Sequence, residues 1–270
     1  MTGAAATAPR RTRLPGETRD AWLRIIAPIA VGVIVLGGWQ FLVSVVGVSD
    51  YLLPSPAAIA EQFVEFGPAI WNATVITGTN ALLGLIVGSI LGIVLAALAS
   101  RWRVLDMMSA PIVASLAVIP IVALAPVLNS MFGADSQFGR QAIAALASFV
   151  PVFLNTLRGF RQVIPVHRDL MTSYAASGTQ ILRTVTLPTA VPFVFTGIRI
   201  ASSLAVISAL VAEYFGGPRG GLGGMISTSA ATSAYARAWA YVFAGILLGL
   251  LFYVVTLLLE RLATRRRGAA

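Results

Sequence analysis

The chain alternates between long apolar runs and short polar segments. Six runs are long enough to cross a membrane as helices, because a helix needs about 20 largely apolar residues to span the hydrocarbon layer. These runs cover residues 25–47, 70–99, 105–132, 139–160, 190–214 and 238–260. All are helical in length rather than strand-like, and in lipid a helix pairs its backbone amides within its own segment. The pattern predicts an all-α fold, a polytopic membrane helix bundle of about six transmembrane helices.

Prolines interrupt two of these runs. Pro111, Pro120 and Pro126 fall in the third run, and Pro151 falls in the fourth. A proline lacks the N–H that continues a helix, but a membrane bundle tolerates it because neighbouring helices satisfy the freed carbonyls. We therefore expect kinks in both helices.

The arginines predict which side of the membrane each segment occupies, since cytoplasmic loops near spans retain an excess of positive charge. With both termini cytoplasmic, fifteen of the nineteen basic residues lie inside. They are Arg10, Arg11, Arg13, Arg19, Arg24, Arg101, Arg103, Arg158, Arg161, Arg168, Arg183, Arg261, Arg265, Arg266 and Arg267. Arg140, Arg219 and Arg237 fall in outer loops, and Arg199 falls in the fifth span. The opposite orientation would place the fifteen outside.

The composition agrees with a membrane location and removes several alternatives. Hydrophobic residues make up 57% of the chain and charged residues only 11%, so most of it cannot face water. The net charge of +9 sits at membrane edges, where it sets topology and meets lipid headgroups. It therefore requires no nucleic-acid partner.

The apolar runs also divide the chain into parts. We expect a basic cytoplasmic tail over residues 1–24, a transmembrane domain over 25–262 and a second basic tail over 263–270. The first run is too long for the core of a cleaved signal sequence and lacks a small-residue cleavage site, so it is interpreted as an uncleaved span.

Missing residue types exclude most chemistry on this chain. It has no cysteine, one histidine (His167) and no lysine. One histidine cannot build a metal site, and a P-loop requires its lysine. The glycine-rich segment from Gly216 to Gly224 is therefore interpreted as a turn and helix start on the outer side. We expect no catalytic residue, metal or cofactor here, and any nucleotide hydrolysis on another chain.

Small residues recur at helical spacing in two spans. Gly84, Gly88 and Gly92 lie four residues apart in the second span, and Gly245 and Gly249 repeat the spacing in the last. Such residues let another helix approach closely. We expect packing surfaces that carry no information on substrate.

The polar segment between the fourth and fifth runs has the pattern of two short amphipathic helices. Pro165 suits a first helical turn, and Leu170 and Tyr174 share one face of the helix that follows. The second helix is expected to end at Leu187 and Pro188. Helices this short are not stable alone, so they must pack on the bundle, on a partner protein, or on both.

This segment resembles the inner loop of the permease subunits of bacterial ATP-binding cassette (ABC) importers, which carries the EAA motif. Alignment on Leu187 and Pro188 places Asp169 at the acidic position of that motif, Leu170 at its first alanine and Ala175 at its glycine. Only the acid and the Leu-Pro pair survive strictly. This relaxed form is typical of the nitrate, taurine and sulfonate branch and of its riboflavin- and pyrimidine-precursor relatives.

Four further passages resemble the same branch in the same order. They read LLPSPAAI, VIPIVALAPVLNSMFG, FVPVFLNTLRGFRQV and LAVISALVAEYFGGPRGGLG, within a likeness that extends from about Tyr51 to Leu262. The resemblance implies a bacterial inner-membrane importer with a second copy of the permease, two ABC ATPase subunits and an extracytoplasmic substrate-binding protein. ATP and Mg²⁺ would be bound by the ATPase.

The resemblance also implies that residues 161–189 form a cytoplasmic coupling region, of which 165–188 dock in a groove of the ATPase. The residues assigned to this contact are Asp169, Leu170, Ser173, Tyr174, Ala175, Gly178, Leu187 and Pro188. Gly178 is expected to supply the flexibility of the bend, and Leu187 with Pro188 to fix the hinge into the fifth span.

Polar residues inside the spans are candidates for the substrate path, because they are costly in lipid and usually face the bundle interior. They are Ser115, Asn129, Asn155, Ser202 and Ser203. Alternatively, these groups bond backbone carbonyls or each other. Arg199 and Glu213 are about 21 Å apart along one helix. Arg199 should therefore neutralise another neighbour or reach the inner surface, with Glu213 near the outer mouth.

The sequence thus predicts the permease subunit of an ATP-driven importer of a small organic solute. The segments VAEYFGG and DLMTSY favour pyrimidine- or riboflavin-type precursors over sulfonates, taurine or nitrate. The alternative is a secondary transporter driven by an ion gradient, a class that often shows inverted repeats. We find no convincing repeat between the two halves of the chain.

Overall fold

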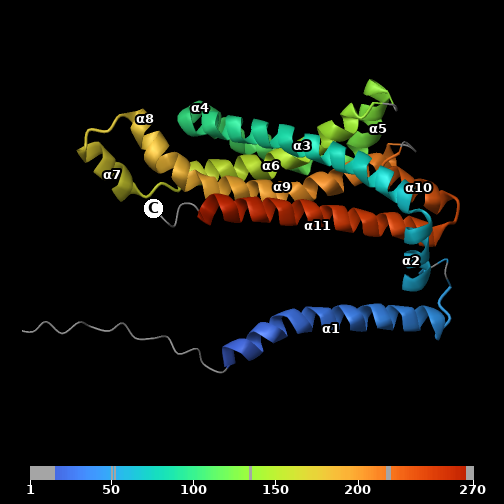
Figure 1. Ribbon diagram of the computed structural model, residues 1–270. Coiled ribbons are helices and arrows are strands. Elements are labelled where there is room, and N and C mark those ends of the chain that lie inside the picture. Colours follow the sequence, from blue (N-terminus) through green and yellow to red (C-terminus); the bar gives the residue numbers. More distant parts are fainter. Residues whose placement is uncertain (1–15, 50, 52, 134–135, 217–219, 266–270) are drawn as a thin grey trace, which may run out of the picture. The chain divides into compact units, whose positions relative to one another are not determined.

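The computed structural model describes residues 16–49, 51, 53–133, 136–216 and 220–265, and within them it contains helices and no strands. The helices are α1 (Gly16–Ser44), α2 (Pro56–Glu65), α3 (Gly67–Arg101), α4 (Arg103–Val118), α5 (Ile121–Phe132), α6 (Phe138–Arg161), α7 (Pro165–Ser173), α8 (Gly178–Ile181), the π-helical turn η1 (Leu182–Thr186), α9 (Leu187–Phe215), α10 (Leu222–Ala231) and α11 (Tyr235–Arg265) (Figure 1). The predicted all-α membrane fold is confirmed.

The chain divides into two units, Met1–Ala58 and Ile59–Ala270. The first contains α1, whose segment Ile26–Ser44 is long and apolar enough to cross a membrane. At the end of α1, the Gln40 side chain donates to the Ser44 hydroxyl at 2.7 Å and accepts from the Ala57 N–H at 3.3 Å. These bonds tie the start of α2 to α1.

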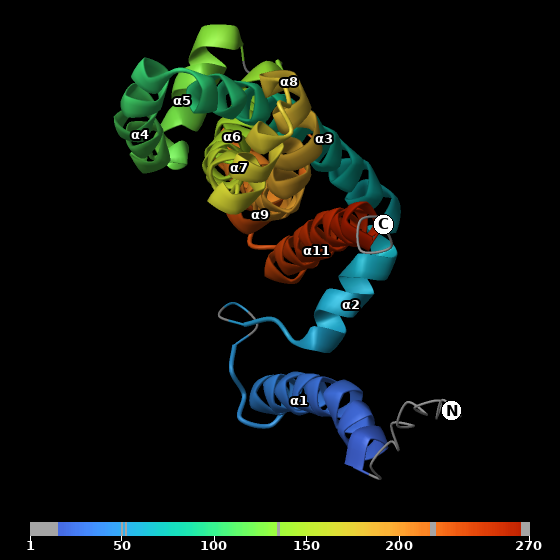
Figure 2. The same ribbon diagram turned by 90° about the vertical axis from the view of Figure 1, so that its left-hand side faces the viewer.

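In the second unit, α6 packs against both α3 and α9 (Figure 2). A Cβ at Gly84 would lie 2.4 Å from the Cβ of Ala144, and one at Gly88 would lie 2.3 Å from the carbonyl oxygen of Ala145. Gly92 continues the contact one turn further on. The backbones of α3 and α6 are therefore in direct contact, and the packing role predicted for these glycines is confirmed.

Helix α6 meets α9 in the same way, further along toward its C-terminal end. A Cβ at Gly159 would lie 2.8 Å from the Cβ of Phe193, and one at Gly197 would lie 3.0 Å from the Cα of Val152. By contrast, a Cβ at Gly249 in α11 would meet only the Val206 side chain, at 3.9 Å. A Cβ at Gly245 would lie 3.1 Å from the Leu210 side chain, so the small residues of α11 face side chains of α9 rather than another backbone.

The third predicted span is broken rather than kinked, because α4 and α5 are bent by 90° relative to each other. Pro120 has no N–H to continue a helix. Ile119 before it adopts extended backbone (φ −62°, ψ 122°), the conformation preferred by a residue that precedes proline. Pro111 and Pro126 lie inside α4 and α5, respectively, without interrupting them.

The two pieces nevertheless connect opposite ends of the bundle. Asp106 in the first turn of α4 pairs with Arg161 in the last turn of α6. At the other end, the Asn129 side chain of α5 donates to the Gly216 carbonyl just beyond α9, at 3.0 Å. We therefore count α4 and α5 as one broken crossing. With α1, α3, α6, α9 and α11 this makes the six crossings predicted.

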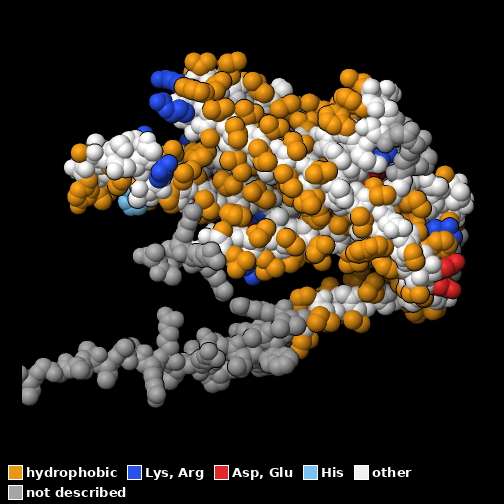
Figure 3. Space-filling view, turned by 45° about the horizontal axis from the view of Figure 1, so that its top comes forward, with side chains coloured by type: hydrophobic (Ala, Val, Ile, Leu, Met, Phe, Trp, Pro, Cys, Tyr) orange, Lys and Arg blue, Asp and Glu red, His pale blue; other side chains and the backbone are white. Residues whose placement is uncertain are grey.

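Exposed arginines mark the end of the bundle that carries α7 and α8. They are Arg101, Arg103, Arg158, Arg161, Arg168 and Arg183. Figure 3 shows apolar side chains over the sides of the bundle and basic side chains at this end. Six crossings return the chain to the side from which it started, so the predicted orientation with cytoplasmic termini agrees with this charge distribution.

Replacement of Gly88 by alanine should destabilise the bundle. The added methyl group would force α3 away from α6, and such overpacking costs about 1–3 kcal/mol, more than the gain of about 1 kcal/mol in helix propensity. We expect Gly88→Ala to lower the melting temperature in detergent, measured by tryptophan fluorescence.

Gly78→Ala is the matched control in the same helix, because its Cβ would meet only the Leu248 side chain, at 3.5 Å. It should keep or raise the melting temperature. Equal effects of the two substitutions would contradict the assignment of Gly88 to the contact between α3 and α6.

Candidate functional site

The inner connector consists of α7, a tight bend and α8. The end of α7 is closed by two backbone hydrogen bonds, from Ala175 N–H to the Thr172 carbonyl at 2.9 Å and from Ala176 N–H to the Met171 carbonyl at 3.0 Å. Ala175 has φ +54°, in the left-handed region that glycine adopts most easily. This bonding pattern is a Schellman motif, whose left-handed position is usually glycine.

Ala175 is therefore the pivot of the bend, at the position where the aligned motif has its glycine. Gly178, which we expected to supply flexibility at the bend, instead begins α8. The start of α8 is held by a capping box. In it, the Ser177 hydroxyl accepts from the Gln180 N–H and the Gln180 side chain accepts from the Ser177 N–H. The geometry of the bend thus depends on a strained alanine and a capped helix start.

Leu187 and Pro188 do not end the second short helix, contrary to our expectation. Residues Gly178–Phe215 are continuously helical, and the turn before Pro188 is a π-helix in which the Leu187 N–H bonds the Leu182 carbonyl at i−5. Proline in a regular helix clashes with the carbonyl four residues before it, and a wider turn provides more room for its ring. The inner connector is therefore joined to α9 by one helix.

The predicted coupling residues lie on this connector or, in the case of Leu187 and Pro188, in the first turn of α9 beside it. Pro188 is partly buried, and the other seven (Asp169, Leu170, Ser173, Tyr174, Ala175, Gly178 and Leu187) are exposed. No side chain of α7 is buried, and Val166, Leu170 and Tyr174 expose 68%, 52% and 77% of their surface. Apolar groups of this kind outside the spans form a surface suited to a protein partner.

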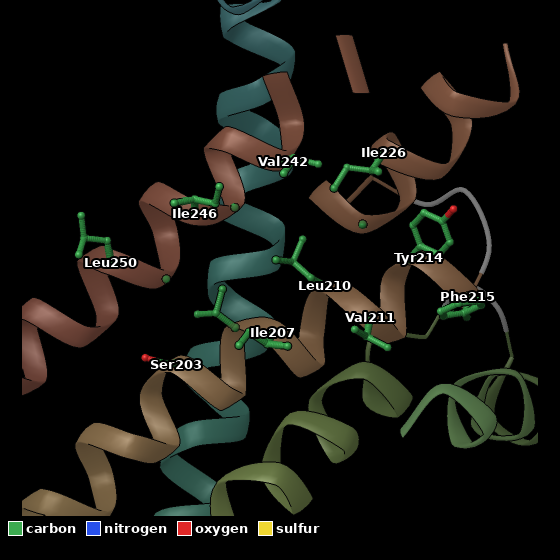
Figure 4. Close-up of a pocket in the computed structure, with 14 residues that line it drawn as sticks. Ser203, Ile207, Leu210, Val211, Tyr214, Phe215, Ile226, Val242, Ile246 and Leu250 are labelled. Atoms are coloured by element: carbon green, nitrogen blue, oxygen red, sulfur yellow. The ribbon is translucent and has the colours of Figure 1, made fainter. Parts of the chain in front are cut away.

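A cavity of about 450 Å³ lies between α9, α10 and α11. Its wall is almost entirely apolar, with Leu210, Ile226, Val242 and Ile246 among the lining residues (Figure 4). Gly245 and Gly249 contribute bare backbone from α11. The spacing of small residues in the last span therefore provides room for this cavity.

Of the five residues predicted for the substrate path, Ser203 lines this cavity. Ser115 and Asn155 donate to the carbonyls of Pro111 and Pro151, and Asn129 donates to Gly216 as described above. Ser202 is buried and bonded to the Arg199 carbonyl and to the Thr256 hydroxyl. These four side chains thus bond backbone carbonyls or other side chains, as the alternative interpretation expected.

Arg199 pairs with a neighbouring helix, as expected. Its Nη1 lies 3.1 Å from Oε2 of Glu260 in α11, and the Thr196 hydroxyl donates to the other carboxylate oxygen at 3.3 Å. This ion pair joins α9 to α11 in the inner half of the bundle.

Glu213 lies at the outer end of α9 in a polar cluster that sequence reasoning did not find. Its carboxylate accepts from the Thr77 hydroxyl at 2.6 Å, the Asn80 amide at 3.2 Å and the Gly223 N–H at 3.2 Å. Arg140, which we placed in an outer loop, is instead buried in the first turn of α6. The sequence signal for this cluster is the pair Thr77 and Asn80, two polar residues that lie one turn apart in an otherwise apolar span.

The comparisons with known proteins agree with this architecture. Residues 88–268 match the family described as binding-protein-dependent transport system inner membrane component. The riboflavin transport system permease protein RibX of Chloroflexus aurantiacus is 32% identical over 94% of both chains. The formylaminopyrimidine transport permease protein ThiX of Halalkalibacterium halodurans is 30% identical over 67% of this chain and 72% of its own.

The putative aliphatic sulfonates transport permease protein SsuC of Escherichia coli is 30% identical over 71% of this chain and 73% of its own. Among solved structures, an amino acid ABC transporter has the same fold, with a TM-score of 0.58 at 14% identity over 77% of this chain and 97% of that one. The chain therefore belongs to the binding-protein-dependent transport system inner membrane components, as a multi-pass permease of the branch that includes the sulfonate and taurine permeases.

Proposed function

We propose that the chain forms the translocation path of an ATP-driven importer and that residues 165–188 dock on a separate ATPase. The observation that carries the proposal is the uncovered apolar side of α7 at the cytoplasmic end. A nine-residue helix with no buried side chain is not stable by itself. A partner that covers Val166, Leu170 and Tyr174 would stabilise it.

The continuous helix that follows the bend supplies the mechanism. From Gly178 to Phe215 the chain is one helix, and the part from Ser203 outward lines the cavity. A displacement of α8 by the ATPase would therefore move the cavity wall directly. ATP binding and hydrolysis would shift the bundle between inward-open and outward-open states.

The assembly that we propose contains a second copy of this chain, two ATPase subunits and an extracytoplasmic substrate-binding protein. The cavity supports the second copy, since its lining residues Ile207, Ile246 and Leu250 on α9 and α11 are exposed and another wall would be needed to enclose a solute. ATP and Mg²⁺ would be held by the ATPase, and this chain would act as a transport subunit rather than as an enzyme.

For the substrate, the cavity favours an uncharged heteroaromatic solute. The lining residues include no arginine that could neutralise a sulfonate or nitrate, and their side-chain polar groups are the hydroxyls of Ser203 and Tyr214. Flat rings gain from apolar and aromatic walls. The names of the relatives RibX and ThiX point to the same chemical class. Mass spectrometry of the ligand that co-purifies with the binding protein tests this proposal, and a sulfonate there would contradict it.

A charge at the bend should uncouple ATP hydrolysis from uptake. In Ala175→Glu, a carboxylate would be placed in the docking surface, where an unpaired charge costs about 3–5 kcal/mol on burial. This corresponds to more than about a hundredfold weaker ATPase binding. Uptake into proteoliposomes should be lost, while the melting temperature of the permease alone stays unchanged.

Ala175→Gly is the control, because glycine adopts the left-handed conformation without the cost of about 1 kcal/mol that alanine bears. It should preserve ATPase co-purification and uptake. Normal uptake by Ala175→Glu would rule out the docking assignment. Uptake driven by a proton or sodium gradient without any ATPase would favour the secondary transporter instead.

Filling the cavity should block the path without unfolding the chain. Gly249→Phe would project a ring into the cavity from α11, where the nearest atom to an added Cβ is 3.9 Å away. We expect uptake to fall at least about tenfold, because the ring would occupy much of the space that the substrate needs. Gly249→Ala should transport normally. Full activity of Gly249→Phe would exclude this cavity from the path.

A further inference from the structure

The polar cluster at the outer end of the bundle holds the first turn of α10. The Leu222 N–H donates to the Thr77 hydroxyl at 2.8 Å, and that hydroxyl donates to the Glu213 carboxylate at 2.6 Å. The Gly223 N–H donates to the same carboxylate at 3.2 Å. A helix normally satisfies its first N–H groups with a capping side chain, but the residue before α10 is Gly221. Side chains of two other helices, α3 and α9, therefore cap α10.

This contact requires that Gly221 and Gly223 carry no side chain. A Cβ at Gly221 would lie 2.3 Å from the Glu213 carboxylate, and one at Gly223 would lie 2.1 Å from the Leu210 carbonyl oxygen. The fit is directional as well as close, because each hydrogen bond needs its donor within about 3.2 Å and well aligned. It therefore specifies one position of α10 rather than a range of positions.

A second layer anchors the carboxylate to the bundle. The Asn80 amide, which bonds Glu213, also donates to the Gln137 side chain at 2.9 Å, and Arg140 donates to the same Gln137 oxygen at 2.8 Å. Glu213 and Arg140 are each 1% exposed. Buried charged groups often stabilise a contact no more than apolar residues of the same size would. Their best-attested use is to specify one arrangement or to act as a switch.

The backbone on both sides of α10 has left-handed residues at which the chain turns. Gly220 before it has φ +79°, and Ser233 after it has φ +58°. Ser233 is one of two described residues other than glycine with positive φ, and the other is Ala175 at the inner bend. α10 is thus a separate short helix between two turns.

Helix α10, whose first turn the cluster holds in place, also forms part of the cavity wall. Gly223 and Ile226 of α10 line it, and Ile226 points toward it across from Leu210 and Val242 (Figure 4). Movement of α10 about its two turns would expose this apolar space at the outer end of the bundle.

From these observations we infer that α10 is a hinged lid over the outer end of the cavity, and that Glu213 and Thr77 form the latch that keeps it closed. Glu213 is a positioning residue, since it acts on the path through α10. The inference rests on the proposed function, because a lid on this cavity matters when solute passes through it.

The lack of cysteine in the chain permits a direct test by single-cysteine labelling. Ile226→Cys places a thiol on the cavity side of α10, and Thr228→Cys places one on its exposed side as the matched control. Each is introduced into the full chain, in right-side-out membrane vesicles without the ATPase. A membrane-impermeant maleimide is added outside, and its reaction rate measures access of water to the thiol.

With the latch intact, Ile226→Cys should react much more slowly than Thr228→Cys. Glu213→Gln or Thr77→Val should raise the rate at Ile226→Cys by about tenfold, the factor expected from loss of one hydrogen bond to a charged group. The rate at Thr228→Cys should stay unchanged, and Thr77→Ser should behave as the unaltered chain. Unchanged labelling of Ile226→Cys, or an equal rise at both positions, would overturn the latch. If Glu213→Gln does not reach the membrane, Thr77→Val decides the result.

A second measurement in the assembled complex tests whether the lid moves during the cycle. Labelling of Ile226→Cys should differ at least about threefold between the nucleotide-free complex and the complex trapped with ATP and vanadate, as expected for a shift between two populated states. Equal labelling in both states would overturn the lid. Failure of the ATPase to assemble would contradict the proposed function, whereas the labelling without ATPase would still decide the latch.

Discussion

The contact of α6 with both α3 and α9 is the interaction on which the rest of the bundle depends. In lipid, apolar side chains gain little by moving from the bilayer to another helix, so association rests on close packing. Gly88 brings α3 onto α6, and Gly159 and Gly197 bring α9 onto it. Because α6 occupies this side of α9, the other side remains for α10, α11 and the cavity between them. A side chain at any of these glycines would therefore change the packing that positions α9 beside the cavity.

Helix α9 joins the two ends of the proposed mechanism. At its inner end the π-helical turn lets the helix continue through Pro188 to α8, so that α8 and the cavity wall belong to one helix. At its outer end Glu213 holds the first turn of α10. A π turn inside a helix often occurs at functional sites, and here its physical cause is local: the proline ring needs space that a regular turn does not provide. Pro188, which would interrupt a regular helix, thus leaves α8 and α9 continuous.

Much of this architecture could be predicted from the sequence, because the bilayer imposes strict rules on span length and charge. The apolar runs located the crossings, the arginines oriented them, and the spacing of Gly84, Gly88 and Gly92 indicated a close helix contact. Local patterns could not separate Pro120, which breaks its span, from Pro111 and Pro126, which do not. Alignment placed Ala175 at a glycine position, but its left-handed backbone became visible only in the fold. The cluster of Glu213 joins residues up to 145 positions apart in the chain, and no local pattern pairs them.

Charged groups at two depths of α9 explain why this helix can be held in discrete positions. Arg199 bonds α9 to Glu260 of α11 in the inner half, whereas Glu213 bonds it to α3 and α10 in the outer half. Apolar contacts between helices change gradually as the helices slide, but an ion pair or a bound N–H is lost within about an ångström of movement. Charges are also costly in a membrane unless they are paired, so a position of α9 that separates a pair must offer each charge a new partner. A helix bonded in this way would move between a few fully paired arrangements, which suits the alternating-access mechanism that we propose.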